Sequence, residues 1–143
     1  MEPILSDLQL GAWRGLLNAH AALTDRIEKA LAAAGLPPLA WYDVLWALYR
    51  APEHRLRMSE LAGHTVVTRS GLTRLVDRME AAGVVERRPA PGDRRGAYAV
   101  VTDAGRDLLR RMWPVYGGSV RDGFATALSD QELAVLRDAL ARI

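Results

Sequence analysis

The chain has 143 residues and a formal net charge of +2, and half of its residues are hydrophobic. This length suits one domain with a modest core, so we expect residues 1–143 to form a single domain. The absence of cysteine excludes disulfides and redox-sensing thiolates, and no apolar run approaches the roughly 20 residues of a membrane span. Because the N-terminus also lacks a signal-like pattern, we expect a cytoplasmic protein.

Residues 5–34 are predicted to form one long helix that is rich in alanine and leucine. At about 45 Å, a helix of this length exceeds what the core of one small domain can cover. We therefore expect part of its apolar face to meet a second subunit. His20 lies on that face and is read either as a core histidine with one hydrogen-bond partner or as a ligand anchor. The apolar face carries Trp13, Leu16, Leu17, Leu23, Ile27 and Leu31.

A second helix is predicted over residues 39–50, and Pro52 follows its end. Only Asp43 and Arg50 are expected to face outward, and a helix that is apolar nearly all round belongs at the centre of a fold. Its aromatic residues suit either a core or the wall of a ligand pocket. They are Trp41, Tyr42, Trp46 and Tyr49.

Residues 58–83 have the pattern of a helix-turn-helix. A short helix over about 58–63 precedes a longer one that Thr68 or Ser70 can cap and Gly83 can end. In this motif the second helix enters the major groove, where Ser, Thr and Arg reach bases and phosphates. The alternative is a solvated face on which Asp77 neutralises its arginine neighbours. The residues that we expect to meet DNA are Thr68, Arg69, Ser70, Thr73, Arg74 and Arg78.

A β-hairpin is predicted over residues 84–101, with a proline- and glycine-containing turn at 89–93. Its tip presents Asp93, Arg94 and Arg95, and Asp93 is close enough in sequence to hold one arginine. An arginine fixed on a thin β-ribbon suits a narrow minor groove. The alternative is an ordinary exposed hairpin whose charges prevent edge pairing. Residues 55–57 could add a short edge strand.

After the hairpin, Thr102 can cap a helix over about 103–113, which Pro114 should kink or break. Ser129 and Glu132 form a capping box that opens a last helix. The apolar stripe of this helix, Leu133, Leu136, Leu140 and Ile143, has little of its own domain left to pack on. We therefore expect residues 5–34 and 129–143 to be dimerisation helices.

Positive charge is confined to one stretch of the chain. Residues 54–95 hold nine arginines and five acidic residues, a net charge of +4, so the remaining residues sum to −2. Neutralising phosphates needs such a patch, and folding does not. We therefore expect residues 55–101 to form a DNA-binding lobe in which residues 84–101 are the wing.

The order of these elements resembles the multiple-antibiotic-resistance regulator (MarR) family over nearly the whole chain. The order includes Val101-Thr102-Asp103-Ala104-Gly105 after the hairpin, and the sharpest matches are residues 70–80 and Asp93-Arg94-Arg95. The resemblance implies a mainly α (α+β) fold, a winged helix-turn-helix lobe with dimerisation helices at both chain ends. It implies a homodimeric transcriptional regulator, usually a repressor, that binds a pseudo-palindromic site on double-stranded DNA. The D-x-R wing motif of the family falls on Asp93 and Arg95, with Arg95 as the minor-groove arginine.

The resemblance also implies a small-molecule effector between the dimer helices and the DNA-binding lobe. His20 or Arg14 could anchor it there. Flat apolar walls with a cationic group suit a small aromatic anion such as a phenolic acid. The alternative is that the aromatic residues simply fill a core. The wall residues would be Trp13, Trp41, Tyr42, Trp46 and Tyr49.

Two other function classes fit the sequence less well. A winged-helix module that binds only protein is disfavoured by the concentrated charge, because interface cores are depleted of charged residues. An enzyme is not expected, since no nucleophile elbow, phosphate loop or carboxylate pair is visible. The three histidines, at 20, 54 and 64, lack the spacing of a zinc site, so no metal or cofactor is expected.

Overall fold

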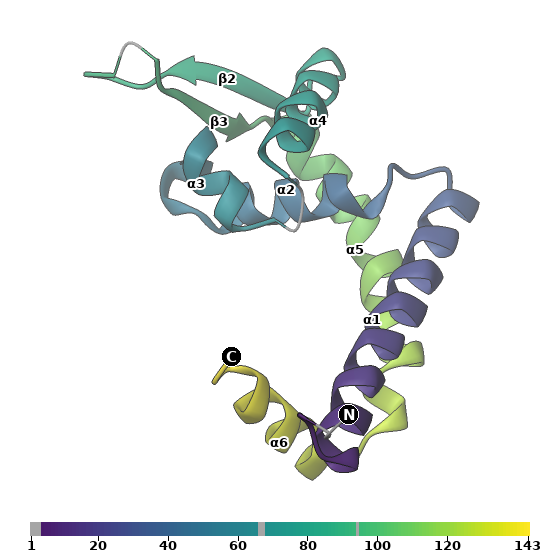
Figure 1. Cartoon of the computed structure of the whole chain (residues 1–143). Coiled ribbons are helices and arrows are strands. Elements are labelled where there is room, and N and C mark those ends of the chain that lie inside the picture. The colour runs from purple at the N-terminus through teal and green to yellow at the C-terminus, as the bar shows by residue number, and fades with distance from the viewer. Residues whose placement is uncertain (1–3, 66–67, 94) are drawn as a thin grey trace.

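The computed structural model describes residues 4–65, 68–93 and 95–143, which form a mainly helical fold with one small sheet (Figure 1). This confirms the predicted fold class. The helices are α1 (Asp7–Ala33), α2 (Leu39–Arg50), α3 (Met58–Gly63), α4 (Arg69–Ala81), α5 (Asp103–Gly123) and α6 (Asp130–Leu140), with short 3-10 turns η1 (Pro52–His54) and η2 (Ala125–Ala127). The strands are β1 (Arg55–Arg57), β2 (Val85–Pro89) and β3 (Ala97–Val101). Among the described residues, no helix is both long and apolar enough to cross a membrane.

The sheet is antiparallel with strand order β1-β3-β2, so the predicted hairpin and the edge strand at 55–57 are both confirmed. Directly paired residues share a face of a sheet. One face therefore carries the row Leu56, Ala99 and Arg87, and the other carries the row Arg57, Tyr98 and Arg88. Ala99 is fully buried, which identifies the first face as the one that packs on the helices.

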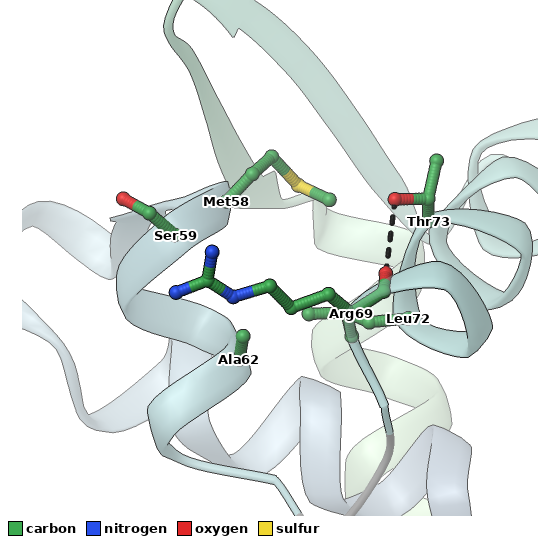
Figure 2. Close-up of a pocket in the computed structure, with 6 residues that line it drawn as sticks. All are labelled: Met58, Ser59, Ala62, Arg69, Leu72 and Thr73. Atoms are coloured by element: carbon green, nitrogen blue, oxygen red, sulfur yellow. Dashed lines mark hydrogen bonds between the residues drawn. The ribbon is translucent and has the colours of Figure 1, made fainter.

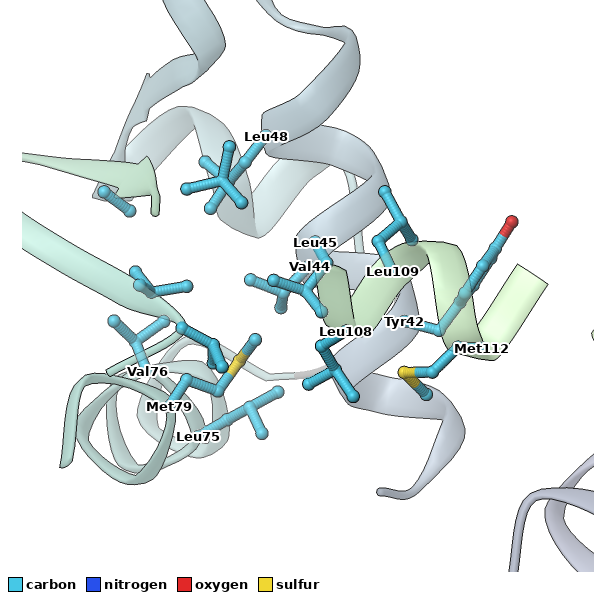
Figure 3. Close-up of a cluster of buried hydrophobic side chains, with 14 of the residues drawn as sticks. Tyr42, Val44, Leu45, Leu48, Leu75, Val76, Met79, Leu108, Leu109 and Met112 are labelled. Atoms are coloured by element: carbon cyan, nitrogen blue, oxygen red, sulfur yellow. The ribbon is translucent and has the colours of Figure 1, made fainter. Parts of the chain in front are cut away.

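The core lies where α2, α4 and α5 meet the base of the sheet (Figure 3). α2 is central, as predicted, because Val44, Leu45 and Leu48 are fully buried. The expectation that only its two charged residues face outward is wrong, since Trp46 and Tyr49 keep 37% and 43% of their surface exposed. One face of α2 is left uncovered by this chain. The predicted stripe of α4 is buried at Leu72, Leu75, Val76 and Met79.

Local signals set both ends of α4. The Thr68 hydroxyl accepts a hydrogen bond from the Gly71 N–H at 3.2 Å, so Thr68 rather than Ser70 is the cap. At the other end Gly83 has a φ of 74°, a left-handed conformation that glycine adopts without a steric cost. It lets the chain turn from α4 directly toward β2.

Of the two outcomes expected at Pro114, a kink or a break, the break is wrong. α5 continues through Pro114 to Gly123. Proline removes one hydrogen bond from a helix interior. Here the apolar face of α5 packs on α1 and α2, with Met112 fully buried just before the proline. Tertiary packing of an amphipathic face thus outweighs the local preference.

α1 and α6 lie at the end of the molecule away from the sheet (Figure 1). In α1 only Ile27 and Leu31 are buried, and His20 is exposed. The reading of His20 as a core histidine is therefore wrong for this chain, because α5 covers only part of the apolar face of α1. The capping box of α6 is confirmed, with the Ser129 N–H donating to Glu132 at 2.8 Å. No residue of α6 is buried.

Candidate nucleic-acid interface

The polar face of α4 is presented to solvent as a direct result of its amphipathic sequence. Two of its hydroxyls are already engaged: Thr68 caps the helix, and the Thr73 hydroxyl donates to the Arg69 carbonyl at 3.2 Å. The structure places all six predicted residues of this face on the surface. They are Thr68, Arg69, Ser70, Thr73, Arg74 and Arg78.

Arg69 lies where α4 meets α3. Its side chain leaves the first turn of α4 and extends over α3, toward Ser59 and Ala62 (Figure 2). Together with Met58 these residues line a hollow of about 180 Å³ between the two helices. Arg69 therefore brings a cation to the groove between α3 and α4.

We call β2, β3 and their connecting turn, residues 85–101, the wing. At its tip the Asp93 carboxylate accepts a hydrogen bond from the Arg95 backbone N–H at 3.0 Å. Its second oxygen lies 3.6 Å from a guanidinium nitrogen of Arg57 in β1. Of the two tip arginines, one of which Asp93 was expected to hold, Arg95 is bound through its backbone N–H and not through its side chain, and the carboxylate also pairs with Arg57. Arg94 lies outside the described residues.

The arginines of residues 55–95 divide into two sets. In one set each guanidinium is paired with a carboxylate: Arg55 with Glu53, Arg57 with Asp93, Arg87 with Asp77 and Glu80, and Arg88 with Glu86. In the other set, within the part of the chain that the structure describes, no ion pair is made by Arg69, Arg74, Arg78 or Arg95. The second set consists of the described arginines that the sequence assigned to DNA.

This division bears on the alternative in which the α4 face is only solvated. Asp77 was expected to neutralise Arg74 and Arg78 if that face were merely solvated. Instead its carboxylate lies 2.7 Å from Arg87 of the wing. The cations on the exposed face of α4 are thus left without an acidic partner among the described residues.

Sequence reasoning missed two residues of this surface, Arg57 and Arg87. The sequence indicates Arg57 only as part of a possible edge strand, yet it contacts Asp93 at the wing tip. Arg87 and Arg88 contribute alike to the net charge of the stretch, so their charge does not distinguish them. Their adjacency in a strand puts them on opposite faces of the sheet, and that alternation was the available signal that their roles differ.

Comparison with known proteins decides the family. The profile of the MarR family matches residues 34–96. The transcriptional regulator PecS of Dickeya dadantii is 33% identical over 132 residues, which cover 90% of this chain and 78% of PecS. The chain belongs to the MarR family of transcriptional regulators.

Two solved MarR-family structures from Streptomyces coelicolor are similar over their length. AbsC is 36% identical with a TM-score of 0.86, and the match covers 97% of this chain and 93% of AbsC. Sco3205, whose structure was determined in complex with DNA, is 32% identical with a TM-score of 0.88, covering 98% of this chain and 88% of Sco3205. Both share the winged helix-turn-helix arrangement described above.

The residues that the sequence assigned to an effector in this MarR-family chain do not all line the same hollow. Trp46 lines a cavity of about 490 Å³, together with Asp43, Arg50 and His64, between α2, η1 and β1. His20 lines a separate hollow of about 380 Å³ beside Tyr116 and Phe124. The other residues of the set line neither of these two hollows: Trp13, Arg14, Trp41, Tyr42 and Tyr49. A single effector site between the dimer helices and the DNA-binding lobe stays a prediction.

The aromatic residues instead form a stack along α2 and α5. Tyr42 lies on Tyr116 with ring centroids 4.1 Å apart, and Trp46 lies on Trp113 at 6.0 Å. The Arg50 guanidinium sits 5.7 Å from the Trp46 ring, which places a cation at the cavity beside it. Within residues 4–65, 68–93 and 95–143, no cluster of three or more His, Asp or Glu side chains is placed to hold a metal ion.

Proposed function

We propose that the protein is a sequence-specific regulator that binds a pseudo-palindromic site on double-stranded DNA as a homodimer. The observation that carries this proposal is the division of the arginines. Folding pairs Arg55, Arg57, Arg87 and Arg88 with carboxylates, while the arginines on α4 and at the wing tip have no acidic partner within the described residues. Exposed cations grouped on one surface are typical of a protein that neutralises the phosphates of a nucleic acid.

The geometry supports a division of labour within the DNA-binding lobe, residues 55–101. The exposed face of α4 would enter the major groove, with Ser70, Thr73 and Arg74 at base edges. The wing tip would reach the neighbouring minor groove through Arg95. That the MarR-family protein Sco3205 was crystallised with DNA supports this assignment at 32% identity.

The homodimer is supported by apolar surface that this chain leaves open at its two ends. In α1, Trp13 and Leu17 are 53% and 47% exposed, and in α6 Val135 is 63% exposed. A groove on α6 is lined by Leu128, Val135 and Leu136. α6 lies at the same end of the molecule as the start of α1 (Figure 1). Two copies joined there would present two α4 helices related by a two-fold axis, as a pseudo-palindromic site requires.

We further propose that the regulator is a repressor that a small aromatic anion releases. The cavity beside Trp46 is the site that we propose for this ligand. That cavity offers a flat indole wall and the Arg50 guanidinium for an acid group. Because it lies between α2 and the strand leading to α3, an occupant could favour one spacing of the two DNA-binding lobes over another.

A gel-shift or anisotropy titration against DNA from upstream of the protein's own gene tests the proposal. We expect saturable binding that weakens steeply as salt rises from 50 to about 200 mM, because several phosphate contacts are made. A protein that selects no sequence from a random DNA pool and shows no salt-dependent binding would instead be a protein-interaction module. For the effector, aromatic acids should quench tryptophan fluorescence and displace DNA, and Arg50→Met should abolish both responses.

A further inference from the structure

Arg87 in β2 connects the wing to the recognition helix. One of its guanidinium nitrogens lies 2.7 Å from Asp77 and 2.8 Å from Glu80, both in α4. The other terminal nitrogen donates to the Thr73 carbonyl at 3.4 Å. Only 27% of the Arg87 side chain is exposed. A single planar fork thus holds three groups spread over two turns of the helix.

The contact of Arg87 with α4 lies where it can affect both the exposed face of α4 and the position of the wing tip. Thr73 is itself one of the residues proposed to meet base edges. On the wing side, Asp93 follows six residues after Arg87, and an extended chain of that length spans about 20 Å. A rotation of about 10° at Arg87 would therefore move the tip by about 3 Å, the scale of one strand residue.

We propose that Arg87 is a positioning residue that sets the wing against α4, so that the helix and the wing tip engage adjacent grooves of one DNA segment. This inference rests on the proposed DNA-binding function. It differs from a simple charge role, in which Arg87 would only neutralise Asp77 and Glu80 near the phosphates. The two roles predict opposite results when those carboxylates are removed.

The first test compares Arg87→Met with Arg88→Met on the full-length protein. Both variants lose one positive charge from the same strand, but Arg88 lies on the outer face and, among the described residues, pairs with Glu86 alone. Hydroxyl-radical footprinting shows whether the protein covers the minor groove of the DNA. Dimethyl sulfate, which methylates guanine N7, shows whether it covers the major groove. We expect Arg87→Met to lose the minor-groove protection, keep the major-groove protection and bind about tenfold more weakly, the effect of one lost charge-assisted contact. Arg88→Met should keep both protections.

The second test is the double variant Asp77→Ala/Glu80→Ala, which keeps Arg87 but removes both of its carboxylate partners. Alanine suits a helix interior, so this variant carries the test if Arg87→Met does not fold. Removing two negative charges beside DNA should tighten binding if charge alone matters. We expect the minor-groove protection to be lost instead.

The outcomes separate this inference from the proposed function. A wild-type protein that protects neither groove would refute DNA binding itself. A wild-type protein that protects both, together with an Arg87→Met or Asp77→Ala/Glu80→Ala variant that also protects both, would overturn the positioning role alone.

Discussion

A Cβ atom on Gly105 would lie 2.1 Å from the carbonyl oxygen of Val84. The first turn of α5 therefore touches the backbone at the base of the wing. The same junction is tied by the Thr102 hydroxyl, which donates to the Gly83 carbonyl at 2.6 Å and accepts from the Gly105 N–H at 3.1 Å. This contact gives a physical reason for the Thr-Asp-Ala-Gly motif.

Gly105→Ala should destabilise the protein strongly, because backbone must shift to admit the methyl group. We expect a loss of at least about 2 kcal/mol in the free energy of unfolding, in the range of overpacked core sites. Thermal unfolding by circular dichroism measures it. Gly118→Ala is the matched control in the same helix, since nothing lies within 4 Å of its Cβ position. It should stabilise by about 0.5–1 kcal/mol, and equal effects at both sites would contradict the close contact.

The wing should supply affinity more than sequence choice. Arg95→Ala is expected to weaken binding to every site and to lower the salt slope by roughly one unit. Asp93→Ala should also weaken DNA binding, but less, because the Arg95 backbone N–H loses its acceptor and Arg57 loses its partner. Binding titrations at several salt concentrations measure both effects. As a control, Lys29→Ala removes one positive charge from α1 and should bind DNA as the wild type does. If Arg95→Ala and Asp93→Ala also bind with wild-type affinity, the wing is not part of the DNA interface.

The exposed face of α4 should set sequence preference. Arg74→Ala, or a change at Ser70 or Thr73, should relax discrimination at particular base pairs by about 1–3 kcal/mol each. Arg78→Ala should instead weaken binding to all sequences alike, as a phosphate contact does. Selection from a random DNA pool compares them. Recovery of the wild-type motif with Arg74→Ala would show that Arg74 does not read bases.

Dimerisation should depend on α6. Val135→Glu places a charge on a side chain that is 63% exposed in one chain, so it should cost little within the monomer. In an apolar interface the same charge should separate the subunits. Deletion of residues 129–143 should give a monomer, an aggregate or an unfolded chain. Sedimentation experiments measure the oligomeric state. Arg137→Glu is the control, because residue 137 lies about 200° away from residue 135 around the helix. A Val135→Glu protein that stays dimeric and binds DNA would exclude α6 from the dimer interface.

Asp43 should make stability depend on pH. Burial, and then the nearby charge of Glu28, raise the pKa of the Asp43 carboxyl above its usual value. A raised pKa in the folded state means that stability is greatest below the unfolded pKa and falls as pH rises through the folded one. Asp43→Asn should therefore raise Tm at pH 7, with a gain that shrinks toward acidic pH. Asp25→Asn, in an exposed pair with Lys29, should change Tm less; equal gains would argue against burial as the cause.

Short-range signals in the sequence determined most of the secondary structure. The bounds of α2 and α3, the capping box at Ser129 and the buried stripe of α4 follow from caps, prolines and apolar spacing within a few residues. Concentrated positive charge pointed to residues 55–95 as the candidate DNA surface in the same way. Each of these depends on neighbours along the chain, which is the information that a sequence states directly.

Only the tertiary structure decided which groups meet. Pro114 stays within α5 because that helix packs on α1 and α2, and Asp93 binds Arg57 because β1 joins the sheet beside the wing. The residues expected to form one effector site do not share one hollow, because α1 and α2 diverge in space. Trp46 of α2 lines one hollow and His20 of α1 lines another. Likewise, the nine arginines and five acidic residues of residues 54–95 give no hint of their partners until the strands and helices are placed. The energy of an ion pair depends on distance through space and not on separation along the chain.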